Sequence, residues 1–410
     1  MSGNSPRPTD RRSFIATGLS CVAGATLLHS ATQSEQMTGS EGTKGRKMIS
    51  RTLGRTGISL PIVSIGAVSF DPGIYRRALD LGIRHFDTAP AYRNGNHETM
   101  LGEVLRGRPR DSFVIATSFG SEVYQDRRTR TFKEDAPVKA LIESFEGSLR
   151  RLKLDYIDIY YLAWACSKET TLYRPYIDAI MKLKDQGKTR FIGVTTHENE
   201  PEVLRAAAGT TLIDVVLTVY NFRQTYREEM KKAIANAAKA DVGIVAMKTQ
   251  AGASWDEESA RIVNMRAALK WVLSDENVHT AVPGIATYDQ LEADFRVMEN
   301  LALTAAEEED LERALRVPYR TFSLFCQNCR ECVAQCPHRL DIPALMRGYM
   351  YARGYKDPGK AKEALRRARI TRVPCGECGQ CHVTCAMGFD VRSRARDIAA
   401  LIDVPDTVVA

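Results

Sequence analysis

The sequence predicts an α/β protein in two parts: a barrel of strand–helix units, followed by a small and mainly helical domain. Two observations lead to this prediction. From Met48 to about Asn300, apolar runs with a strand period alternate with stretches that have the helical period. The last part of the 410-residue chain instead carries eight of its ten cysteines, in two tight groups. We therefore expect a barrel over residues 48–317, a cysteine-rich domain over 318–392 and a tail over 393–410.

The expected strands are eight apolar runs, at residues 60–70, 84–89, 112–118, 156–164, 190–196, 214–221, 243–249 and 280–286. Helix-like patterns follow them, for example at 98–107, 138–154, 176–188 and 228–240. Eight such units in about 250 residues are what a (β/α)8 TIM barrel needs. A doubly wound sheet is the alternative, but it usually carries a glycine-rich phosphate loop after its first strand. No G-x-G-x-x-G motif occurs there.

Both cysteine groups have the spacing C-x2-C-x2-C-x3-C: Cys326, Cys329, Cys332 and Cys336, then Cys375, Cys378, Cys381 and Cys385. A disulfide framework would scatter cysteines over a short secreted chain. Zinc sites usually use two separated C-x2-C pairs or mix cysteine with histidine, and two zinc knuckles are the alternative here. Four thiolates at this tight spacing instead suit a cubane [4Fe-4S] cluster. The doubled motif therefore predicts two such clusters.

The fourth cysteine of each group lies too far round to close the cluster that the first three hold. In two-cluster ferredoxins this cysteine ligates the other cluster. The expected ligand sets are therefore Cys326, Cys329, Cys332 and Cys385 for one cluster, and Cys375, Cys378, Cys381 and Cys336 for the other. Pro337 follows the first group as in the usual pattern, whereas Ala386 follows the second.

The segment between the two cysteine groups predicts two short helices with a Gly/Pro break, in "IPALMRGYMYARG" and "PGKAKEALRRARIT". This arrangement resembles the helical ferredoxin modules of respiratory and heterodisulfide-type reductases, which pass single electrons. We therefore expect a small, mainly α-helical two-cluster ferredoxin-like domain after the barrel.

The N-terminus carries twin arginines, Arg11 and Arg12, before an apolar run that reaches Leu28. The run is shorter than the ~20 residues that a membrane span needs. It resembles a Tat export signal over residues 1–32, followed by a polar linker over 33–47. The Tat translocase carries folded proteins, which suits a chain that receives clusters before export. We expect a periplasmic or other extracytoplasmic location; an uncleaved amphipathic anchor is the alternative.

The composition limits the partners. Lys and Arg total 57 and Asp and Glu total 50, a net charge of +7. No stripe of interleaved aromatic and basic residues indicates nucleic acid. After the N-terminal run, no stretch is apolar enough to span a membrane. A basic stretch near the clusters, "LRRARITR", is expected to be a solvated helix face, although it would also suit an acidic redox partner protein.

The barrel region carries further motifs: "RTLGRTGISLPIVSIG", "GIRHFDTAPAY", "LGEVLRG", "SFVIATS", "SLRRLKLDYIDIYYL", "GIVAMK" and "VPGIATYDQLEADF". Together and in this order they resemble the aldo/keto reductase family. The resemblance implies a tyrosine that gives a proton to a substrate carbonyl as hydride arrives from NAD(P)H. It also implies an aspartate and a lysine that set the pKa of the tyrosine, and a histidine that orients the substrate.

Only two of these four family residues are present. Asp87 matches the aspartate and Tyr92 the tyrosine, and both are expected to be catalytic. Ser118 stands where the family has lysine, and Ala163 where it has histidine. A tyrosine has a pKa near 10 and is a poor acid at neutral pH unless a cation lowers that pKa, and serine carries no charge. Candidate substitutes at the barrel rim are His97, His197 and Lys248.

The resemblance also places a nicotinamide site at the barrel mouth, with candidate cofactor-binding residues Thr195, Thr196, Asn221, Lys248 and Gly284. Two positions depart from the family. Leu217 stands where glutamine is usual, and Gln290 stands where an arginine often grips the 2′-phosphate. A strong preference for NADP is therefore not expected, and loss of the nicotinamide site stays open.

Two functional hypotheses follow. The first is an exported iron–sulfur oxidoreductase, in which the barrel acts on a small organic carbonyl or alcohol with electrons relayed by two [4Fe-4S] clusters. The alternative is an electron-transfer or partner-binding protein whose barrel is catalytically silent. A closed polar pocket at Tyr92 with a substitute base would favour the enzyme. A pocket filled by side chains such as Trp164 would favour the silent barrel. Ser118 and Ala163 argue against an ordinary NADPH-dependent aldehyde reductase.

Overall fold

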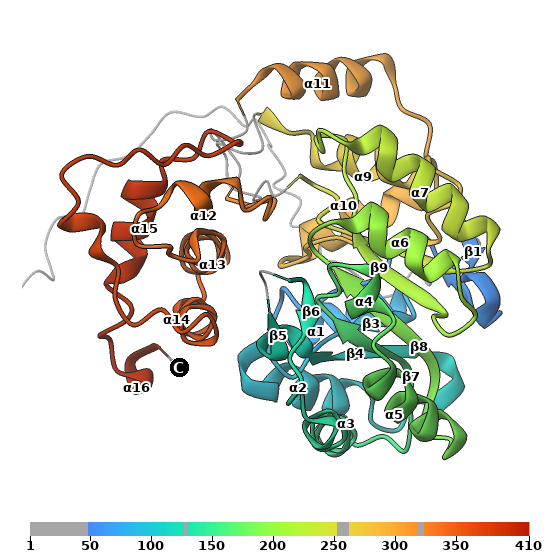
Figure 1. Ribbon diagram of the computed structural model, residues 1–410. Helices are drawn as coiled ribbons and strands as arrows, with labels where there is room; N and C mark the ends of the chain where they lie inside the picture. The colour runs from blue at the N-terminus through green and yellow to red at the C-terminus, as the bar shows by residue number, and fades with distance from the viewer. Residues whose placement is uncertain (1–47, 127–128, 252–261, 319–323, 410) are drawn as a thin grey trace, which may run out of the picture. The chain divides into compact units, whose positions relative to one another are not determined.

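Seven parallel strands form the sheet of the first domain in the computed structural model, which describes residues 48–126, 129–251, 262–318 and 324–409 (Figure 1). Across the sheet they are β11 (Thr280–Val282), β10 (Gly243–Met247), β9 (Val215–Val219), β8 (Thr189–Thr196), β7 (Ile157–Ala163), β4 (Val114–Gly120) and β3 (His85–Asp87). Each strand runs parallel to its neighbours. Seven of the eight expected strands are thereby confirmed.

The first expected strand, 60–70, joins the two edges of this sheet through single bridges. Val63 pairs with Ala281 of β11, and Ile65 pairs with Phe86 of β3, both in parallel. The N–H of Ser64 donates to the carbonyl of Ala281 at 2.8 Å. Leu60 and Pro61 end a short strand, β2 (Ser59–Pro61), and the rest of the run is not a regular strand, so the prediction of its length was wrong. With this segment between its edges, the sheet forms a nearly closed parallel barrel, and the predicted TIM-barrel class is confirmed.

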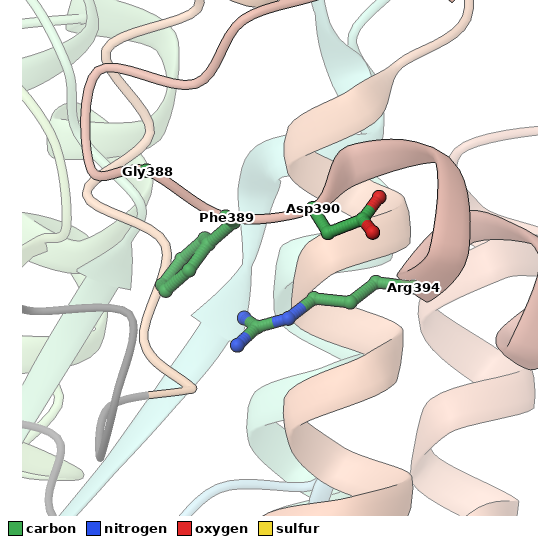
Figure 2. A pocket seen from close by; sticks show the side chains of 4 residues that line it. All are labelled: Gly388, Phe389, Asp390 and Arg394. Atoms are coloured by element: carbon green, nitrogen blue, oxygen red, sulfur yellow. The ribbon is translucent and has the colours of Figure 1, made fainter.

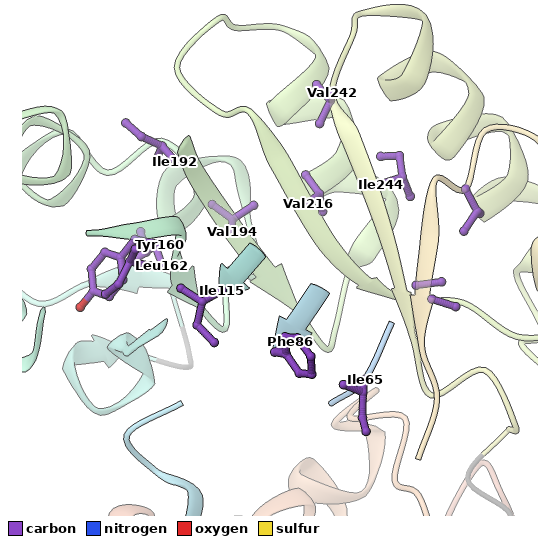
Figure 3. Packing of buried hydrophobic residues seen from close by; sticks show 14 of the residues in the cluster. Ile65, Phe86, Ile115, Tyr160, Leu162, Ile192, Val194, Val216, Val242 and Ile244 are labelled. Atoms are coloured by element: carbon purple, nitrogen blue, oxygen red, sulfur yellow. The ribbon is translucent and has the colours of Figure 1, made fainter. Parts of the chain in front are cut away.

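Helices surround the barrel: α1 (Pro72–Asp80), α2 (Asn96–Leu105), α3 (Val138–Leu152), α5 (Arg174–Asp185), α6 (Glu200–Ala208), α7 (Arg227–Lys239), α9 (Met265–Leu273) and α10 (Tyr288–Val297). α3 shows why such segments fold against the sheet. Its buried residues Leu141, Phe145, Leu149 and Leu152 repeat at helical spacing and form one apolar face. Outward-facing strand residues such as Ile115, Val194, Val216 and Ile244 supply the other side of this core (Figure 3). A short helix, α4 (Lys168–Thr171), and a hairpin of β5 (Gln125–Asp126) and β6 (Thr131–Phe132) complete the rim.

Inward-facing strand residues form a separate cluster inside the barrel. One end of this cluster includes Leu53, Ile58 and Leu60, from the hairpin of β1 (Ser50–Thr52) and β2 (Ser59–Pro61). The same cluster also includes Phe325 and Met350, which belong to the second domain. The second domain therefore contributes directly to the apolar interior of the barrel.

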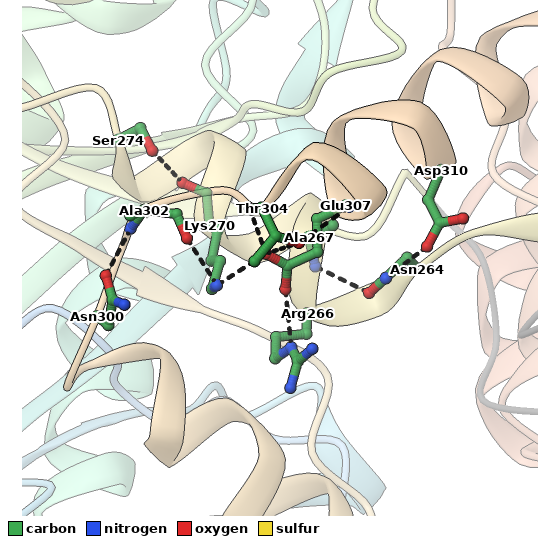
Figure 4. Close-up of polar contacts among 10 residues, drawn as sticks. All are labelled: Asn264, Arg266, Ala267, Lys270, Ser274, Asn300, Ala302, Thr304, Glu307 and Asp310. Carbon is green, nitrogen blue, oxygen red and sulfur yellow. Dashed lines mark hydrogen bonds and ion pairs between the residues drawn. The ribbon is translucent and has the colours of Figure 1, made fainter.

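The last helix before the second domain, α11 (Ala305–Arg316), is held to α9 by a buried carboxylate (Figure 4). Glu307 accepts from Lys270 Nζ at 2.9 Å and from Arg266 Nε at 3.0 Å. Burial alone would raise the pKa of Glu307, but the Thr304 N–H and the Lys270 and Arg266 cations outweigh burial and lower it to about 2. The carboxylate therefore stays ionised and keeps α11 fixed to the barrel.

The second domain is helical, with α12 (Glu331–Gln335), α13 (Ile342–Tyr349), a π-helical turn η6 (Met350–Gly354), α14 (Pro358–Arg367), α15 (Val391–Ala399) and α16 (Asp406–Val409). The two helices expected between the cysteine groups are α13 and α14, so that prediction is confirmed. Asp341 and Asp357 cap them, and a proline occupies the first turn of each. α15 starts before the expected tail, and its Ala395 and Ile398 are buried in the core of this domain.

Two predictions made for the N-terminus, the export signal over 1–32 and the linker over 33–47, fall outside the described residues. Within the described ranges, no helix has both the length and the apolar character that crossing a membrane requires.

Candidate functional site

Three of the four positions that match the family's catalytic residues lie at or near the C-terminal ends of barrel strands. Asp87 ends β3, and Ser118 lies two residues before the end of β4. Ala163 ends β7. Residues two apart on a strand share a face, so Ser118 and Ala163 point inward together with Ala116 and Tyr161 of the interior cluster. This is the end of the barrel where active sites are built.

Asp87 and Tyr92 both resist ionisation here. Burial raises the pKa of Asp87 to about 7. Burial also raises the pKa of Tyr92 well above its usual value, and the charge of Asp87 raises it further. Tyr92 starts a short turn, η2 (Tyr92–Gly95), whose next two residues, Arg93 and Asn94, adopt left-handed backbone angles. The barrel supplies the tyrosine and the aspartate, but Ser118 supplies no cation to make the phenol a better acid.

The candidate substitutes His97 and His197 have different surroundings. His97 is buried in α2, with its Nδ1 2.8 Å from Thr88 Oγ1 and its Nε2 2.7 Å from Tyr75 Oη. Burial lowers its pKa to about 3. Both ring nitrogens are thus used within the fold. His197 instead stacks on Trp164 with ring centroids 3.9 Å apart, and burial lowers its pKa well below the usual value.

Two residues at the barrel mouth have strained backbones. Trp164 follows β7 with φ 66°, and Lys248 follows β10 with φ 58°. Such left-handed angles are uncommon outside glycine, and they gather at functional sites. Lys248 Nζ donates to Tyr355 Oη of the second domain at 3.3 Å. Arg347 of α13 lies 4.6 Å from the Trp164 ring centroid. The second domain therefore contacts both residues.

A small cavity of about 30 Å³ lies where the two domains meet at the barrel mouth. Trp164, His197 and Lys248 of the barrel line one part of it. The second domain lines the rest with Phe325, Cys326, Asn328, Pro343, Arg347, Met350 and Tyr351. A predicted cluster ligand, Cys326, therefore lies at the same cavity as the aromatic residues of the barrel. The sequence contains no local signal for this arrangement, because these residues come from distant parts of the chain.

The expected nicotinamide-binding residues are bonded within the chain. Thr195 Oγ1 accepts the N–H of Trp164 at 3.1 Å, and Thr196 Oγ1 donates to the carbonyl of Glu198 at 2.8 Å. Asn221 Oδ1 accepts the N–H of Arg223 at 3.1 Å. After Gly284, the N–H groups of Ala286 and Thr287, which precede α10, both donate to the side chain of Gln290. The Thr196 hydroxyl and the N–H groups of Ala286 and Thr287 thus already donate within the chain, whereas Thr195 and Asn221 only accept in these bonds and keep their own O–H and N–H donors.

The cysteines of the second domain are free thiols, as is Cys166 of the barrel. Burial raises the pKa of Cys326 to about 12 and that of Cys332 to about 11. Nearby thiolates add to both shifts: Cys332 and Cys385 act on Cys326, and Cys385 and Cys329 act on Cys332. Burial likewise raises the pKa of Cys375, and the thiolates that add to it are Cys378, Cys336 and Cys381.

Cys385 thus lies near Cys326 and Cys332, and Cys336 lies near Cys375. The fourth cysteine of each motif lies near the other motif, as a two-cluster ferredoxin requires. Among the described residues, no three His, Cys, Asp or Glu side chains are arranged to hold a single metal ion. The ligand assignment stays a prediction.

Arg394 is a cation near Cys326 and Cys385. Figure 2 shows its side chain next to those of Phe389 and Asp390. Its guanidinium carbon lies 3.9 Å from the Phe389 ring centroid, beside a surface hollow lined by Gly388, Phe389, Asp390 and Arg394. Burial lowers the pKa of Arg394, while Tyr349 and the thiolates of Cys385 and Cys326 raise it. A cation so placed favours the more negative, reduced state of a nearby cluster.

Replacing this cation should lower the reduction potential of one cluster. We expect Arg394→Gln to shift the midpoint potential of the cluster held by the Cys326 set to a more negative value, because the reduced state loses a neighbouring positive charge. An EPR-monitored redox titration measures both potentials. Arg396→Gln, an exposed change on the same helix, is the matched control. Equal potentials in Arg394→Gln and the unchanged protein would contradict the prediction.

The fold and the two residue groups define an oxidoreductase built from a barrel and an iron–sulfur domain. The aldo/keto reductase family model matches residues 72–267, and a 4Fe-4S dicluster domain matches residues 325–390. The chain thus carries an aldo/keto reductase family domain followed by a 4Fe-4S dicluster domain, and it is an aldo/keto reductase-like oxidoreductase with a ferredoxin-type domain.

Among individual proteins, L-galactose dehydrogenase from Arabidopsis thaliana is 26% identical over 305 residues, which is 64% of this chain and 91% of that protein. L-glyceraldehyde 3-phosphate reductase from Escherichia coli K12 is 24% identical over 322 residues, with the same shares. The solved structure of an aldo-keto reductase from Bacillus halodurans in its holo form matches with a TM-score of 0.52 and 25% identity. That match covers 65% of this chain and 96% of the solved one. These matches concern the barrel.

Proposed function

We propose that the protein reduces or oxidises a small organic carbonyl or alcohol at the barrel mouth, with electrons carried singly through two [4Fe-4S] clusters. One observation carries the proposal. The cavity at the mouth is lined both by barrel residues, Trp164, His197 and Lys248, and by Cys326 of the cluster domain. A redox centre held there would lie next to the place where an aldo/keto reductase-like barrel does its chemistry.

The clusters would supply single electrons. The residues of the chain would donate the proton and bind the substrate. Tyr92 is the proton donor to the substrate oxygen. The stacked rings of Trp164 and His197 give a flat wall against which a small substrate packs. The Arg347 and Lys248 cations favour a substrate that carries partial or full negative charge. Reduction of a carbonyl to an alcohol takes two electrons and two protons. Tyr92 gives the proton on oxygen, solvent water gives the one on carbon, and a one-electron partner must deliver electrons twice per turnover.

The substrate class in this proposal is a small hydroxy-carbonyl compound. The two relatives described above are named for L-galactose and L-glyceraldehyde 3-phosphate, which both carry an aldehyde carbon beside hydroxyl groups. The proposal also includes export through the Tat route, because Arg11 and Arg12 precede a short apolar run and because clusters are inserted before folded proteins are exported.

The silent-barrel alternative has its own support. Phe325 and Met350 join the apolar interior of the barrel, and the cavity at the mouth measures only about 30 Å³, room for about one water molecule. If the second domain never moves away from the barrel mouth, the barrel serves only as a scaffold for electron transfer. An experiment must therefore separate electron exchange from chemistry on a substrate.

The test uses the full mature chain, purified without oxygen and loaded with iron and sulfide. The clusters are reduced with a photoreduced deazaflavin, and L-glyceraldehyde 3-phosphate or methylglyoxal is added. The proposal expects the clusters to be reoxidised while the corresponding alcohol forms. Tyr92→Phe should slow this reaction by about 100-fold. It should leave reoxidation by ferricyanide unchanged.

The same protein with oxidised clusters and L-galactose tests the reverse direction. Ferricyanide reoxidation without any carbonyl or alcohol turnover would favour the silent barrel. Cluster reduction by NADH or NADPH would show instead that the barrel binds a nicotinamide cofactor and passes its electrons to the clusters.

A further inference from the structure

A lysine lies against Tyr92 even though the barrel has lost the family lysine. It is Lys360, in α14 of the cluster domain. Its Nζ lies 3.7 Å from the centroid of the Tyr92 ring and 4.6 Å from that of Tyr351. The ammonium group therefore lies over the face of the Tyr92 ring, where a cation favours negative charge on the phenolic oxygen.

α14 is tied to the barrel next to the strand that lacks the lysine. Ser118 is in β4, and Glu122 follows in the short turn η4 (Ser121–Tyr124). Arg367 of α14 donates to Glu122 Oε1 at 2.8 Å and is itself held by Glu363 at 2.7 Å. At the other end of α14, Asp357 caps the helix by accepting the N–H of Lys360 at 2.8 Å. The C-terminal end of α14 is thus fixed to the barrel, and the Asp357 cap starts the helix so that Lys360 lies in its first turn.

The surroundings of Lys360 make its proton mobile near neutral pH. Burial lowers its pKa to about 7; Lys248 and Arg367 favour the same direction, and Asp357 opposes it. The other titratable groups around the Lys360 ammonium group are Tyr92, Tyr351, His97, His197 and Asp87. Tyr92 keeps its proton at neutral pH, and both histidines stay neutral. Lys360 and Asp87 are therefore the groups of this set that change charge near pH 7.

We propose that Lys360 of the cluster domain takes the part of the missing lysine: its ammonium group stabilises the Tyr92 phenolate and returns a proton to it. The inference rests on the proposed function for the step that makes the phenolate. In that step the Tyr92 hydroxyl gives its proton to the substrate oxygen. The Lys360 ammonium then gives one proton to the phenolate, and the neutral amine takes a proton from water. Lys360 is in this sense a positioning residue, because it acts through Tyr92.

The first test needs no substrate. The cluster-loaded protein is labelled with 3-fluorotyrosine, and the Tyr92 signal is assigned in the ¹⁹F NMR spectrum by its loss in Tyr92→Phe. We expect the Tyr92 signal to move with a midpoint near pH 7, because the charge above its ring changes. In Lys360→Met that step should disappear and leave only the contribution of Asp87, which Asp87→Asn removes. Lys356→Met, an exposed change before the same helix, should keep the step. An identical titration in Lys360→Met and the unchanged protein would overturn the proposal.

The second test uses the turnover assay. Lys360→Met should lower the rate at pH 7 by about 100-fold. Lys360→Arg keeps a cation at the ring and should restore part of the rate. The part of the pH dependence near 7 that comes from Lys360 should vanish, because arginine does not release its proton in this range, and only the part from Asp87 should remain. An unchanged rate and pH profile in Lys360→Met would overturn the proposal. If no carbonyl compound is turned over, the proposed function fails, while the ¹⁹F titration still decides whether Lys360 controls the charge at Tyr92.

Discussion

Replacing Cys385 with alanine should remove the cluster that starts at Cys326, not the one to which its own motif belongs. The reason is the crossed grouping of the thiols, in which Cys385 acts on Cys326 and Cys332 while Cys336 acts on Cys375. A variant that lacks any one of these eight cysteines should lose about half of the bound iron, because one cubane loses a ligand and the other keeps all four.

The EPR spectrum of the surviving cluster shows which one was lost. Crossed ligation predicts that Cys385→Ala gives the same remaining spectrum as Cys329→Ala, and that Cys336→Ala gives the same one as Cys378→Ala. Ligation within each motif would pair Cys385 with Cys378 and Cys336 with Cys329. Cys166→Ala, a buried change in the barrel, is the control and should keep all of the iron. If the protein instead contains zinc, the cluster interpretation is wrong.

Replacing Asp87 with asparagine should stabilise the protein above neutral pH. Burial raises the pKa of Asp87 from 3.8 to about 7, so the folded chain holds this proton more tightly than the unfolded chain does. Stability therefore falls as pH rises from about 4 to 7, and the full penalty is present above pH 7. Asparagine has nothing to ionise. We expect the free energy of unfolding of the variant to exceed that of the unchanged protein by a few kcal/mol at pH 8, because each unit of pKa shift corresponds to about 1.4 kcal/mol. At pH 4 the two proteins should have almost the same stability.

The difference in unfolding midpoint between pH 5 and pH 8 measures this effect, with the clusters loaded in both proteins. Asp111→Asn changes an exposed aspartate in the same way and serves as the control. A gain of equal size at both pH values would mean that the carboxylate is not held neutral by burial. The expected gain also has a functional side, because a residue kept at a cost in stability is usually kept for its chemistry.

The sequence predicted the elements of the fold well because they depend on local patterns. Period-two apolar runs predicted seven of the barrel strands, and the Gly/Pro break between the cysteine groups separated α13 from α14. The first strand was expected to be too long, because an apolar run does not show where backbone pairing stops. Within the run, Val63 and Ile65 pair with the barrel edges, whereas Leu60 and Pro61 pair with β1.

The candidate site was harder to predict because its parts are far apart along the chain. Asp87, Tyr92, Ser118 and Ala163 were placed at the mouth by resemblance, and the structure brings them to one end of the barrel. Lys360 carries no motif, and it lies outside the basic stretch at 365–372 that was expected to be a solvated helix face. Its position above Tyr92 depends on how two domains pack, which no local pattern contains. His97 was a candidate to replace a missing catalytic residue, but the structure shows that both of its ring nitrogens contact buried partners, Thr88 and Tyr75.

The packing of the second domain against the barrel mouth has a consequence for how the protein matures. Small metal domains owe much of their folding to the metal they bind. In this chain the same domain brings Lys360, Arg347 and Tyr351 to the mouth of the barrel. The barrel can therefore fold early while its chemistry stays unfinished until iron arrives. Under the function proposed above, a chain without its clusters would have a correct barrel but would lack the lysine that lies over Tyr92, so that cluster insertion would be the step that completes the site.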